Sequence, residues 1–261
     1  MKSFSLIQIK VENNIAYVTL KNPPVNALNA RMLEELNQCI DGLAEHPSIR
    51  ATVLTGDGAF FVAGADIKEL MSLFEQEEEA KKAAQRGQSL FTKIEKSEKP
   101  IIAAINGACL GGGLELAMSC HIRLTAHKAK IGLPETNLGL IPGYGGTQRL
   151  ARLTNTAKAL ELILTGQLID GREAERIGLV NHSVEESQLL AKAAETAELI
   201  AQKSRLSVKA AMQSVLTGAA LPLQEGQILE AEQFAGLFAS KDVQEGVTAF
   251  IEKRTPAFKD R

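Results

Sequence analysis

The chain has 261 residues, of which 45% are hydrophobic and 23% are charged. This is the composition of an ordinary globular protein, and it excludes disorder, collagen and coiled coil as descriptions of the whole chain. The 29 basic and 31 acidic residues leave a net charge of −2. That balance argues against nucleic acid and acidic membranes as partners, because binding to phosphates needs a basic surface. At about 150 residues per domain, the length allows one or two domains.

The number of cysteines and the lengths of the apolar runs indicate the cellular compartment. The three cysteines, Cys39, Cys109 and Cys120, are too few for a disulfide framework, which indicates a reducing compartment. The first residues do not form a signal peptide, because polar side chains interrupt their apolar stretch. The longest uncharged apolar run, residues 101–114, is shorter than the about 20 residues of a membrane span. We therefore expect a soluble, cytoplasmic protein.

The N-terminal half alternates short apolar runs, typical of strands, with stretches of helical periodicity. Strands are expected at residues 6–11, 15–20, 51–56, 101–107 and 122–126, and helices at about 29–44 and 66–99. This alternation predicts an α/β fold with a largely parallel sheet. From about residue 155 the pattern is mostly helical, over 157–164, 171–177, 184–204, 206–216 and 225–253 in two pieces. No low-complexity linker separates the halves, so we expect these helices to pack on the core or on another subunit.

Several common sites are not indicated. The chain has no phosphate-binding loop and no nucleophile elbow of the hydrolase type, and its glycine runs do not match the dinucleotide fingerprint. The four histidines are scattered, without the spacing of metal ligands. We therefore predict no metal site.

The most informative segment is residues 105–120, in which a buried strand ends before three glycines and a helix. Glycine lets a backbone approach a ligand closely, and a helix N-terminus presents unpaired N–H groups. Glu115 follows Gly112 by three residues, so both lie on nearly the same face of the helix. A donor and a carboxylate would then face one small volume. The alternative is a tight turn with Glu115 in solvent.

Two further segments carry similar features. In residues 60–70, small residues precede a helix that has Asp66 in its first turn, and the N–H of Ala65 could face a ligand; a capped helix without function is the alternative. In residues 130–150, Glu135 lies in an apolar loop, where burial would raise its pKa, unless the loop is exposed. Together, two carboxylates and two N–H groups suit acid–base chemistry through an enolate-like intermediate.

These segments resemble the crotonase (enoyl-CoA hydratase/isomerase) superfamily over nearly the whole chain. The strings that carry the resemblance are NPPVNALN (22–29), FVAGADIKEL (61–70), INGACLGGGLELAMSC (105–120), GLPETNLGLIPGYGGTQRL (132–150), LTGQLIDGREAERIGLVNHSV (164–184) and DVQEGVTAFIEKRTPAF (242–258). The resemblance implies a core of repeated ββα units over residues 1–200 and a helical trimerisation region over 201–261. It also implies a homo-oligomer, either a trimer or a hexamer built as a dimer of trimers.

The resemblance further implies an acyl-CoA thioester as substrate, with no tightly bound cofactor beyond the coenzyme A of the substrate itself. The oxyanion hole maps to the N–H groups of Ala65 and Gly112, and the catalytic glutamates map to Glu115 and Glu135. Glu115 would position and deprotonate water for attack at C3, and Glu135 would exchange the proton at C2.

Contacts with the substrate and with coenzyme A are also implied by position. They map to Val25, Ala27, Leu28, Ala63, Asp66, Ile67, Lys68, Gly111, Pro134, Tyr144, Phe250 and Lys253, the last two from a neighbouring subunit. Many family members have a basic residue where this chain has Pro24, so the resemblance does not extend to a phosphate contact there. For Lys68 and Lys253, a solvated helix face is the alternative, and for Tyr144 a plain loop aromatic.

The leading hypothesis is an enoyl-CoA hydratase, a lyase of fatty-acid β-oxidation or related degradation, that adds water syn to a trans-2-enoyl-CoA. Two alternatives keep the fold: a Δ3–Δ2 enoyl-CoA isomerase, and a hydratase of a branched or aromatic acyl-CoA. An alternative of another class is a non-catalytic acyl-CoA-binding protein. Two carboxylates beside the thioester favour an enzyme, since a binding protein has no use for them.

Overall fold

The computed structural model describes residues 3–261. Within this part, the chain forms nine β-strands, eleven α-helices and one 3-10 helix, η1. The backbone divides into two compact units, Met1–Glu195 and Thr196–Arg261. Both β-sheets belong to the first unit, which also contains the site considered below.

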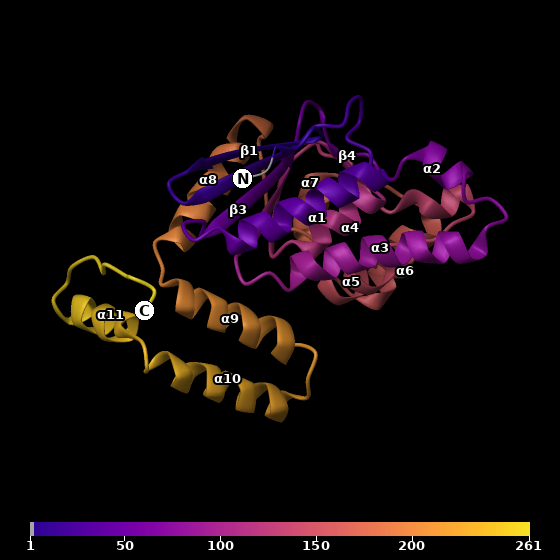
Figure 1. The fold of residues 1–261 in the computed structure, drawn as a ribbon. Coiled ribbons are helices and arrows are strands. Elements are labelled where there is room, and N and C mark those ends of the chain that lie inside the picture. The colour runs from indigo at the N-terminus through magenta and orange to yellow at the C-terminus, as the bar shows by residue number, and fades with distance from the viewer. Residues whose placement is uncertain (1–2) are drawn as a thin grey trace. The chain divides into compact units, whose positions relative to one another are not determined.

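A six-stranded sheet forms the centre of the first unit (Figure 1). Its spatial order is β1 (Ile7–Glu12), β2 (Ile15–Leu20), β3 (Ala51–Gly56), β5 (Ile101–Ile105), β7 (Ile122–Ala126) and β9 (His182–Val184). The β1–β2 hairpin is antiparallel and every other pair is parallel. All five residues of β5 are buried, which explains its uninterrupted apolar sequence, because a central parallel strand is covered on both faces.

A second sheet has three short parallel strands, β4 (Phe60–Val62), β6 (Ala108–Leu110) and β8 (Ile131–Gly132). Each of them follows a strand of the larger sheet in the chain: β4 follows β3, β6 follows β5 and β8 follows β7. Helical segments follow each pair of strands. The core is therefore a repeated ββα arrangement, as predicted, in which the second strand of every pair leaves the large sheet for the small one.

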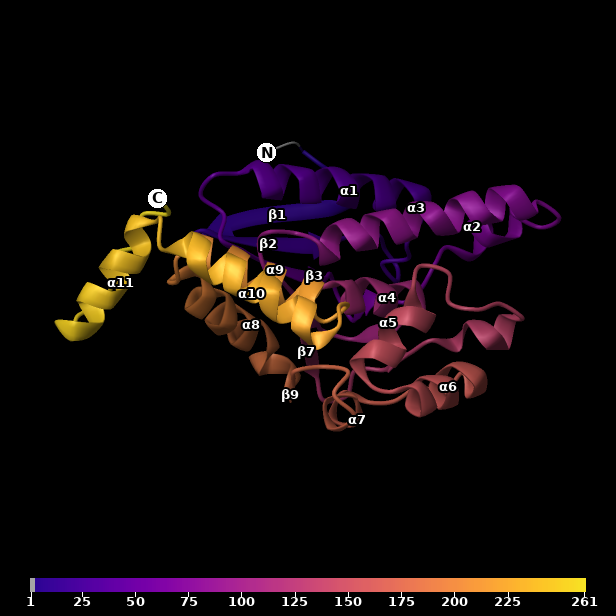
Figure 2. The ribbon, with the colours of Figure 1, turned by 90° about the horizontal axis from the view of Figure 1, so that it is seen from below.

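Helices complete the first unit. They are α1 (Ala30–Glu45), α2 (Ile67–Met71), α3 (Glu77–Glu95), α4 (Gly112–Ser119), η1 (Pro134–Leu138), α5 (Gly146–Leu153), α6 (Thr156–Thr165) and α7 (Gly171–Arg176), with α8 (Glu186–Ala201) running across the boundary to the second unit. Helix α1 starts at Asn29, whose side chain accepts a hydrogen bond from the N–H of Met32, and it buries residues at helical spacing. Helices α1 and α3 lie side by side (Figure 1, Figure 2).

The second unit contains α9 (Arg205–Gly218), α10 (Leu223–Leu237) and α11 (Lys241–Ile251), with α9 and α10 packed against each other. No residue of α10 is buried. Large apolar side chains are instead exposed on all three helices and the loop between the first two: Val215, Leu216, Leu221, Leu223, Ile228, Phe234, Phe238, Val247, Phe250 and Ile251. Exposure of so many apolar side chains marks a surface suited to contact with another protein surface.

The prediction of strands and helices differs from the structure in several places, and α5 was not among the predicted helices. The expected helix over residues 66–99 is two helices, α2 and α3, separated by residues 72–76. The small sheet was not predicted. Strand β9 occupies residues 182–184, so Val184 ends a strand where the predicted helix begins. The predicted larger strands and the helix after Asn29 are confirmed to within about two residues at each end.

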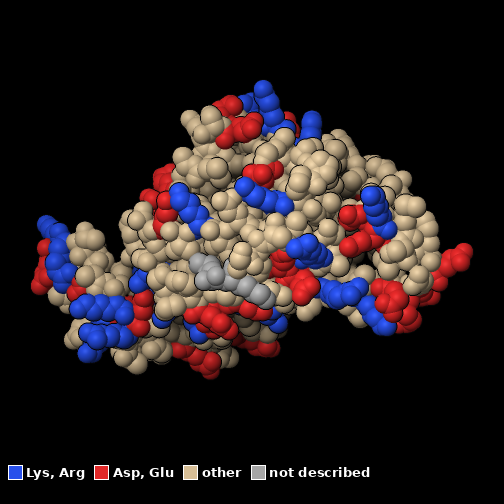
Figure 3. Space-filling view, turned by 45° about the horizontal axis from the view of Figure 1, so that its top comes forward, with Lys and Arg blue, Asp and Glu red and all other residues tan. Residues whose placement is uncertain are grey.

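The surface charge agrees with the small net charge. On the face shown in Figure 3, basic and acidic side chains are interspersed. In the part of the chain that the structure describes, no helix combines the length and the apolar character needed to cross a membrane.

Candidate active site

A cavity of about 370 Å³ in the first unit brings together the predicted catalytic segments. Polar groups lie on one side of it, around the start of α4 and η1. The rest of the wall is mostly apolar and comes from α2, α3 and the loops after η1. The lining residues are Ala63, Gly64, Ala65, Ile67, Leu70, Leu73, Phe74, Ala80, Ala83, Ala84, Leu110, Gly111, Gly112, Glu115, Pro134, Glu135, Leu138, Leu140, Ile141, Gly143 and Tyr144.

The first backbone donor at the cavity is the N–H of Ala65, in the loop between β4 and α2. Leu28 forms a parallel bridge with Ala65, in which the Leu28 N–H donates to Gly64 O and the Leu28 carbonyl accepts from Asp66 N. Since Leu28 bonds to the residues on either side of Ala65, the N–H of Ala65 points away from Leu28. Gly64, which precedes it, has φ +118, a conformation that favours glycine.

The second donor is the N–H of Gly112, the first residue of α4. The first N–H groups of a helix have no partner within the helix, and they carry the positive end of its dipole. Gly111 precedes this donor with φ +52, and its own N–H donates to Gly132 O of β8 at 2.9 Å. A β-carbon on Gly111 would stand 3.8 Å from Gly64 Cα. The glycines that precede the two donors are therefore neighbours.

Glu115 lies one turn into α4 and is only 1% exposed. Its Oε1 accepts hydrogen bonds from the N–H of Tyr144 at 2.8 Å and from that of Gly146 at 2.6 Å. Burial raises the pKa of Glu115 to about 7, the two N–H groups oppose that rise, and the charge of Glu135 adds to it. The alternative of a solvated Glu115 is therefore wrong, and this carboxyl group titrates near neutral pH.

Glu135 lies in η1, the short helix that follows β8. Its Oε2 is buried and has no hydrogen-bond partner in the described structure. Burial raises the pKa of this carboxyl group, while its own backbone N–H opposes the rise. A carboxyl oxygen without a partner is well suited to the protonated form, in which it can donate to a ligand. Of the two alternatives for this loop, the structure favours a partly buried Glu135 over a fully exposed one.

Tyr144 packs its ring between α3 and α4. A β-carbon on Gly87 of α3 would stand 2.3 Å from Tyr144 Cδ1, and one on Gly112 would stand 3.4 Å from Cδ2. The ring also makes an edge-to-face contact with Phe91, with centroids 5.6 Å apart. Burial raises the pKa of the Tyr144 phenol, and the charge of Glu115 raises it further. Tyr144 therefore forms part of the cavity wall and is not a free loop aromatic.

The remaining predicted contact residues fall into two groups. Ala63, Ile67, Gly111 and Pro134 line the cavity with Tyr144. The other five do not line it. Val25 O accepts from Ala63 N, Ala27 O accepts from Asn22, Leu28 is buried, Asp66 caps α2, and Lys68 is exposed.

Phe250 and Lys253 belong to the second unit and are not among the residues that line the cavity. Phe250 is 85% exposed. Lys253 follows α11 and is exposed as well.

Sequence reasoning missed most of the apolar wall. Three of the missed residues, Ala80, Ala83 and Ala84, share one face of α3 with Gly87. Small residues at this helical spacing leave space beside a helix, and that pattern could have located the wall. The donors to Glu115 were also missed. They are backbone N–H groups of residues 144 and 146, and the type of side chain does not indicate where a backbone N–H points.

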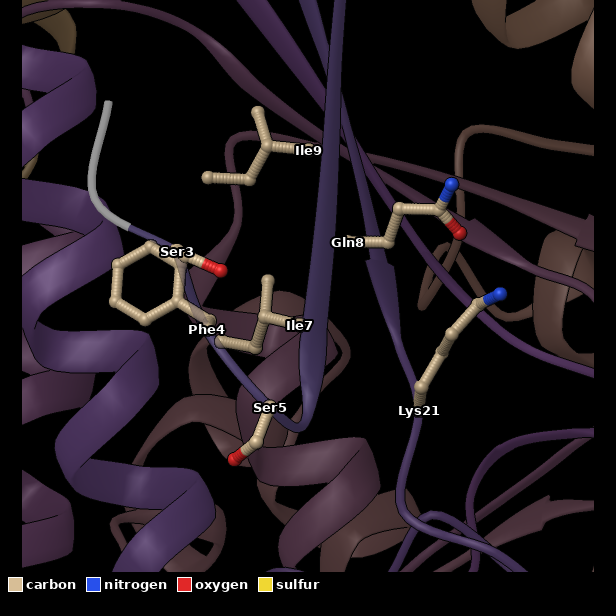
Figure 4. Close-up of a pocket in the computed structure, with 7 residues that line it drawn as sticks. All are labelled: Ser3, Phe4, Ser5, Ile7, Gln8, Ile9 and Lys21. Carbon is tan, nitrogen blue, oxygen red and sulfur yellow. The ribbon is translucent and has the colours of Figure 1, made fainter.

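A second hollow, of about 410 Å³, lies at the start of β1 (Figure 4). Its lining residues are Ser3, Phe4, Ser5, Ile7, Gln8, Ile9 and Lys21. Ile7 and Ile9 point to one side of β1 and Gln8 to the other (Figure 4). The lining holds one basic group and no carboxylate, so it offers no acid–base pair. Within residues 3–261, no group of three or more His, Cys, Asp or Glu side chains is placed to hold a metal ion.

The cysteines and histidines next to the site have structural positions. All three cysteines are free and buried, and burial raises the pKa of Cys120 to about 12, so it remains a thiol. His121 accepts a hydrogen bond from the N–H of Ile101 at 2.9 Å, and burial lowers its pKa. The three thiols and His121 therefore belong to the packing around the site and do not line the cavity.

The arrangement supplies what enolate chemistry needs. Two N–H groups that follow glycines can donate hydrogen bonds to an oxygen on which negative charge develops. Two carboxyl groups with raised pKa values can move protons beside it. The apolar wall can take a hydrocarbon group.

Comparison with known proteins identifies the family. The enoyl-CoA hydratase/isomerase family model matches residues 10–261. The chain is 47% identical to a Bacillus subtilis protein named probable enoyl-CoA hydratase, over 97% of this chain and 98% of that one. It is 41% identical to the short-chain-enoyl-CoA hydratase of Clostridium acetobutylicum, over 97% of each chain. A crystal structure of enoyl-CoA hydratase from Bacillus anthracis superposes with a TM-score of 0.94 at 38% identity, covering 98% of this chain and all of that one. The chain belongs to the enoyl-CoA hydratase/isomerase family.

Proposed function

We propose that this protein is an enoyl-CoA hydratase, a lyase that adds water reversibly to a trans-2-enoyl-CoA to give a 3-hydroxyacyl-CoA. The observation that carries the proposal is the pair Glu115 and Glu135, which line one cavity together with Ala65 and Gly112. Relatives named as enoyl-CoA hydratases, at 39% to 47% identity over nearly their whole length, support it.

The thioester oxygen of the substrate would accept hydrogen bonds from the N–H groups of Ala65 and Gly112. As water adds at C3, negative charge moves onto this oxygen, so both donors stabilise the transition state more than the ground state. Each such donor contributes about 3 kcal/mol to lowering a barrier of this kind. The dipole of α4 adds to the effect of Gly112, since its positive end faces the same oxygen.

The two carboxyl groups would divide the proton transfers. Glu115 would act as the base, because two N–H groups already hold its Oε1 and favour the ionised form, leaving Oε2 to accept from water. Glu135, with an oxygen that has no partner, would act as the acid and donate a proton to C2. One O–H bond of the water breaks as its hydroxyl adds to C3, and that proton goes to Glu115. Glu115 then releases its proton and Glu135 takes one up, by exchange with solvent or with each other, which restores the starting states. Both groups act on the same side of the double bond, which gives syn addition.

The acyl group would lie against the apolar wall formed by α2, α3 and the residues after η1. Leu70, Phe74 and Ala84 are part of that wall. Coenzyme A would leave the cavity past the loops that contain Val25 and Asp66. The hydrogen bond from Ala63 N, in the cavity wall, to Val25 O supports this path. Coenzyme A enters and leaves as part of the substrate, and we propose no tightly bound cofactor.

We also propose that the protein is a homo-oligomer, a trimer or a hexamer built as a dimer of trimers. The exposed apolar side chains of the second unit support a subunit interface there. Phe250 and Lys253 would then contact coenzyme A bound to a neighbouring subunit. Sedimentation equilibrium tests this proposal, and a monomer at micromolar concentration would contradict it.

The test of function is hydration of crotonyl-CoA, followed by the loss of ultraviolet absorbance of the conjugated thioester. Wild type should consume the substrate and produce 3-hydroxybutyryl-CoA. A shift of the double bond without hydration would indicate an isomerase. Binding of the thioester without exchange of its C2 proton with solvent would indicate a non-catalytic acyl-CoA-binding protein. Either result would overturn the proposal.

A further inference from the structure

The turn that holds Glu115 is itself held from outside the cavity. The two N–H donors to Glu115 belong to Tyr144 and Gly146, at the end of the loop that leads into α5. Both reach the same oxygen, Oε1, so a small rotation of the turn would weaken both bonds together. The orientation of Glu115 and the preference for its ionised form therefore depend on how firmly residues 144–146 are fixed.

Arg149 fixes this turn from within α5. It lies one turn into the helix, and its Nη1 reaches back to donate to Tyr144 O at 3.0 Å. Tyr144 is thus held at both backbone groups, its N–H by Glu115 and its carbonyl by Arg149. Gly145 lies between them with φ +104, and a β-carbon there would stand 2.5 Å from Arg149 Nη1. The guanidinium therefore lies directly against the turn, in space that any other residue at position 145 would need.

Glu95 holds the other side of the guanidinium. Arg149 Nη2 donates to Glu95 Oε2 at 2.9 Å, and Glu95 is the last residue of α3. The Arg149 side chain is 11% exposed, against 41% for that of Glu95. The planar guanidinium thus bridges α3 and the turn with two donors at fixed spacing, which a lysine could not do with one nitrogen. Arg149 is absent from the cavity wall, so it would act through the turn and not by touching substrate.

We propose that Arg149, anchored by Glu95, is a positioning residue that fixes residues 144–146 so that their N–H groups orient Glu115 and hold it in its ionised form. The role of Glu115 as the base rests on the proposed function, whereas the geometry of the bridge does not. The positive charge of Arg149 acts in the same direction, because it lowers the pKa of Glu115. Loss of Arg149 should therefore reduce the fraction of ionised Glu115 at neutral pH.

Other titratable groups around this pair come from each element packed against α4. Glu135 of η1 raises the pKa of Glu115, and the Cys120 thiol, at the C-cap of α4, stays protonated.

The neighbouring helix and strands supply the other groups. Helix α3 supplies Glu95, the partner of Arg149, and Arg86, which lowers the pKa of the Tyr144 phenol. Strand β6 supplies the buried thiol of Cys109, and β4 has no titratable side chain.

The test compares three substitutions in the full-length protein. Arg149→Met removes both donors and the charge, so kcat for crotonyl-CoA should fall about 10- to 100-fold with KM nearly unchanged, as expected when a reacting group is misplaced. The acid limb of the pH profile of kcat/KM should move to higher pH. Arg149→Lys keeps the charge but cannot span both acceptors, so kcat should fall and the acid limb should move to higher pH by less than in Arg149→Met. Glu95→Gln should lower kcat in the same direction by a smaller factor.

Arg152→Met is the matched control. Arg152 lies on the same helix, is exposed and donates only to Gln148 in the described structure. This variant should have the kcat and the pH profile of wild type. Folding of every variant is checked by circular dichroism and thermal unfolding. A folded Arg149→Met variant with wild-type kcat and an unmoved acid limb overturns the proposal. If that variant does not fold, wild-type kcat in both Arg149→Lys and Glu95→Gln overturns it equally.

A spectroscopic readout separates this proposal from the proposed function. Infrared titration of the Glu115 carboxyl, assigned by subtracting the spectrum of Glu115→Gln, measures its pKa without substrate. That pKa should be higher in Arg149→Met than in wild type and unchanged in Arg152→Met. Equal pKa values in wild type and Arg149→Met contradict the positioning role. If wild type fails to hydrate crotonyl-CoA, the proposed function fails, and the infrared comparison still decides the role of Arg149.

Discussion

The carboxylate of Glu135 occupies the space beside Gly111 that a side chain would need. A β-carbon on Gly111 would stand 3.0 Å from Glu135 Oε1, and the residue has φ +52. The N–H of Gly111 donates to Gly132 O, which joins the turn before α4 to the strand that leads to Glu135. One glycine therefore sets the position of the donor at Gly112 and the position of the second carboxyl group.

Gly111→Ala should impair both stability and catalysis. Gly111 has φ +52 and ψ −124, outside the left-handed helical region, so an alanine there costs more than the about 1–2 kcal/mol of a left-handed residue. The added methyl would also push the Glu135 carboxylate out of place. We expect a loss of kcat of about tenfold or more, since a displacement near 1 Å can cost that much. Gly58→Ala is the control, because Gly58 has φ +69 but open space around it. Equal kcat losses in both variants, measured with crotonyl-CoA, would contradict the role of the contact with Glu135.

Glu115 should make the protein less stable as the pH rises. Its pKa is about 7 in the folded protein, against an ordinary value of 4.5. Between these values the native state keeps the proton and the unfolded state releases it, so the free energy of unfolding decreases as pH increases. The full effect is about 3 kcal/mol, present below the unfolded-state pKa and lost as pH rises through the folded-state pKa.

The difference in unfolding free energy between wild type and Glu115→Gln isolates this contribution. Urea unfolding at about pH 5 and about pH 8 should show wild type losing more stability than Glu115→Gln over that interval. A difference that stays constant with pH would mean that the pKa of Glu115 is not raised.

Gly87 and Gly42 should respond in opposite ways to the same substitution. Both lie inside helices, α3 and α1, where alanine favours the helix by about 1 kcal/mol. A β-carbon on Gly42 meets nothing within 4 Å, so Gly42→Ala should raise the melting temperature. A β-carbon on Gly87 would stand 2.3 Å from Tyr144 Cδ1, so Gly87→Ala should lower it and displace the ring from the cavity wall. Stabilisation by both substitutions would show that the Tyr144 ring is free to move.

The strands of the six-stranded sheet were predictable because their sequences have the apolar, β-branched composition of buried strands. The segment ATVLTG of β3 and the segment IIAAI of β5 are β-branched or apolar runs that a central parallel strand must bury. The strands of the small sheet have only two or three residues each, too few for any period to be visible. Their pairing comes from the tertiary structure, and it is this sheet that leads to the cavity.

The candidate site was predictable only in its side chains and glycines. Residue type alone indicates a carboxyl group at Glu115 and Glu135 and a close backbone approach at the glycines before α4. The two donors to Glu115 are backbone groups of a loop about 30 residues further along the chain, and no pattern within residues 105–120 indicates them. Arg149 looks like one more charged helix residue until its contacts with Tyr144 and Glu95 are known.

The most direct measurement is the rate of crotonyl-CoA hydration by wild type, Glu115→Gln, Glu135→Gln and the double variant. If both carboxyl groups transfer protons, each single substitution should lower kcat about 10²- to 10⁴-fold. The double variant should be little slower than the slower single one, because the two groups act as a unit. Glu161→Gln, exposed on α6, is the control and should match wild type. Near wild-type turnover in both single variants, with the proteins folded, would contradict the mechanism.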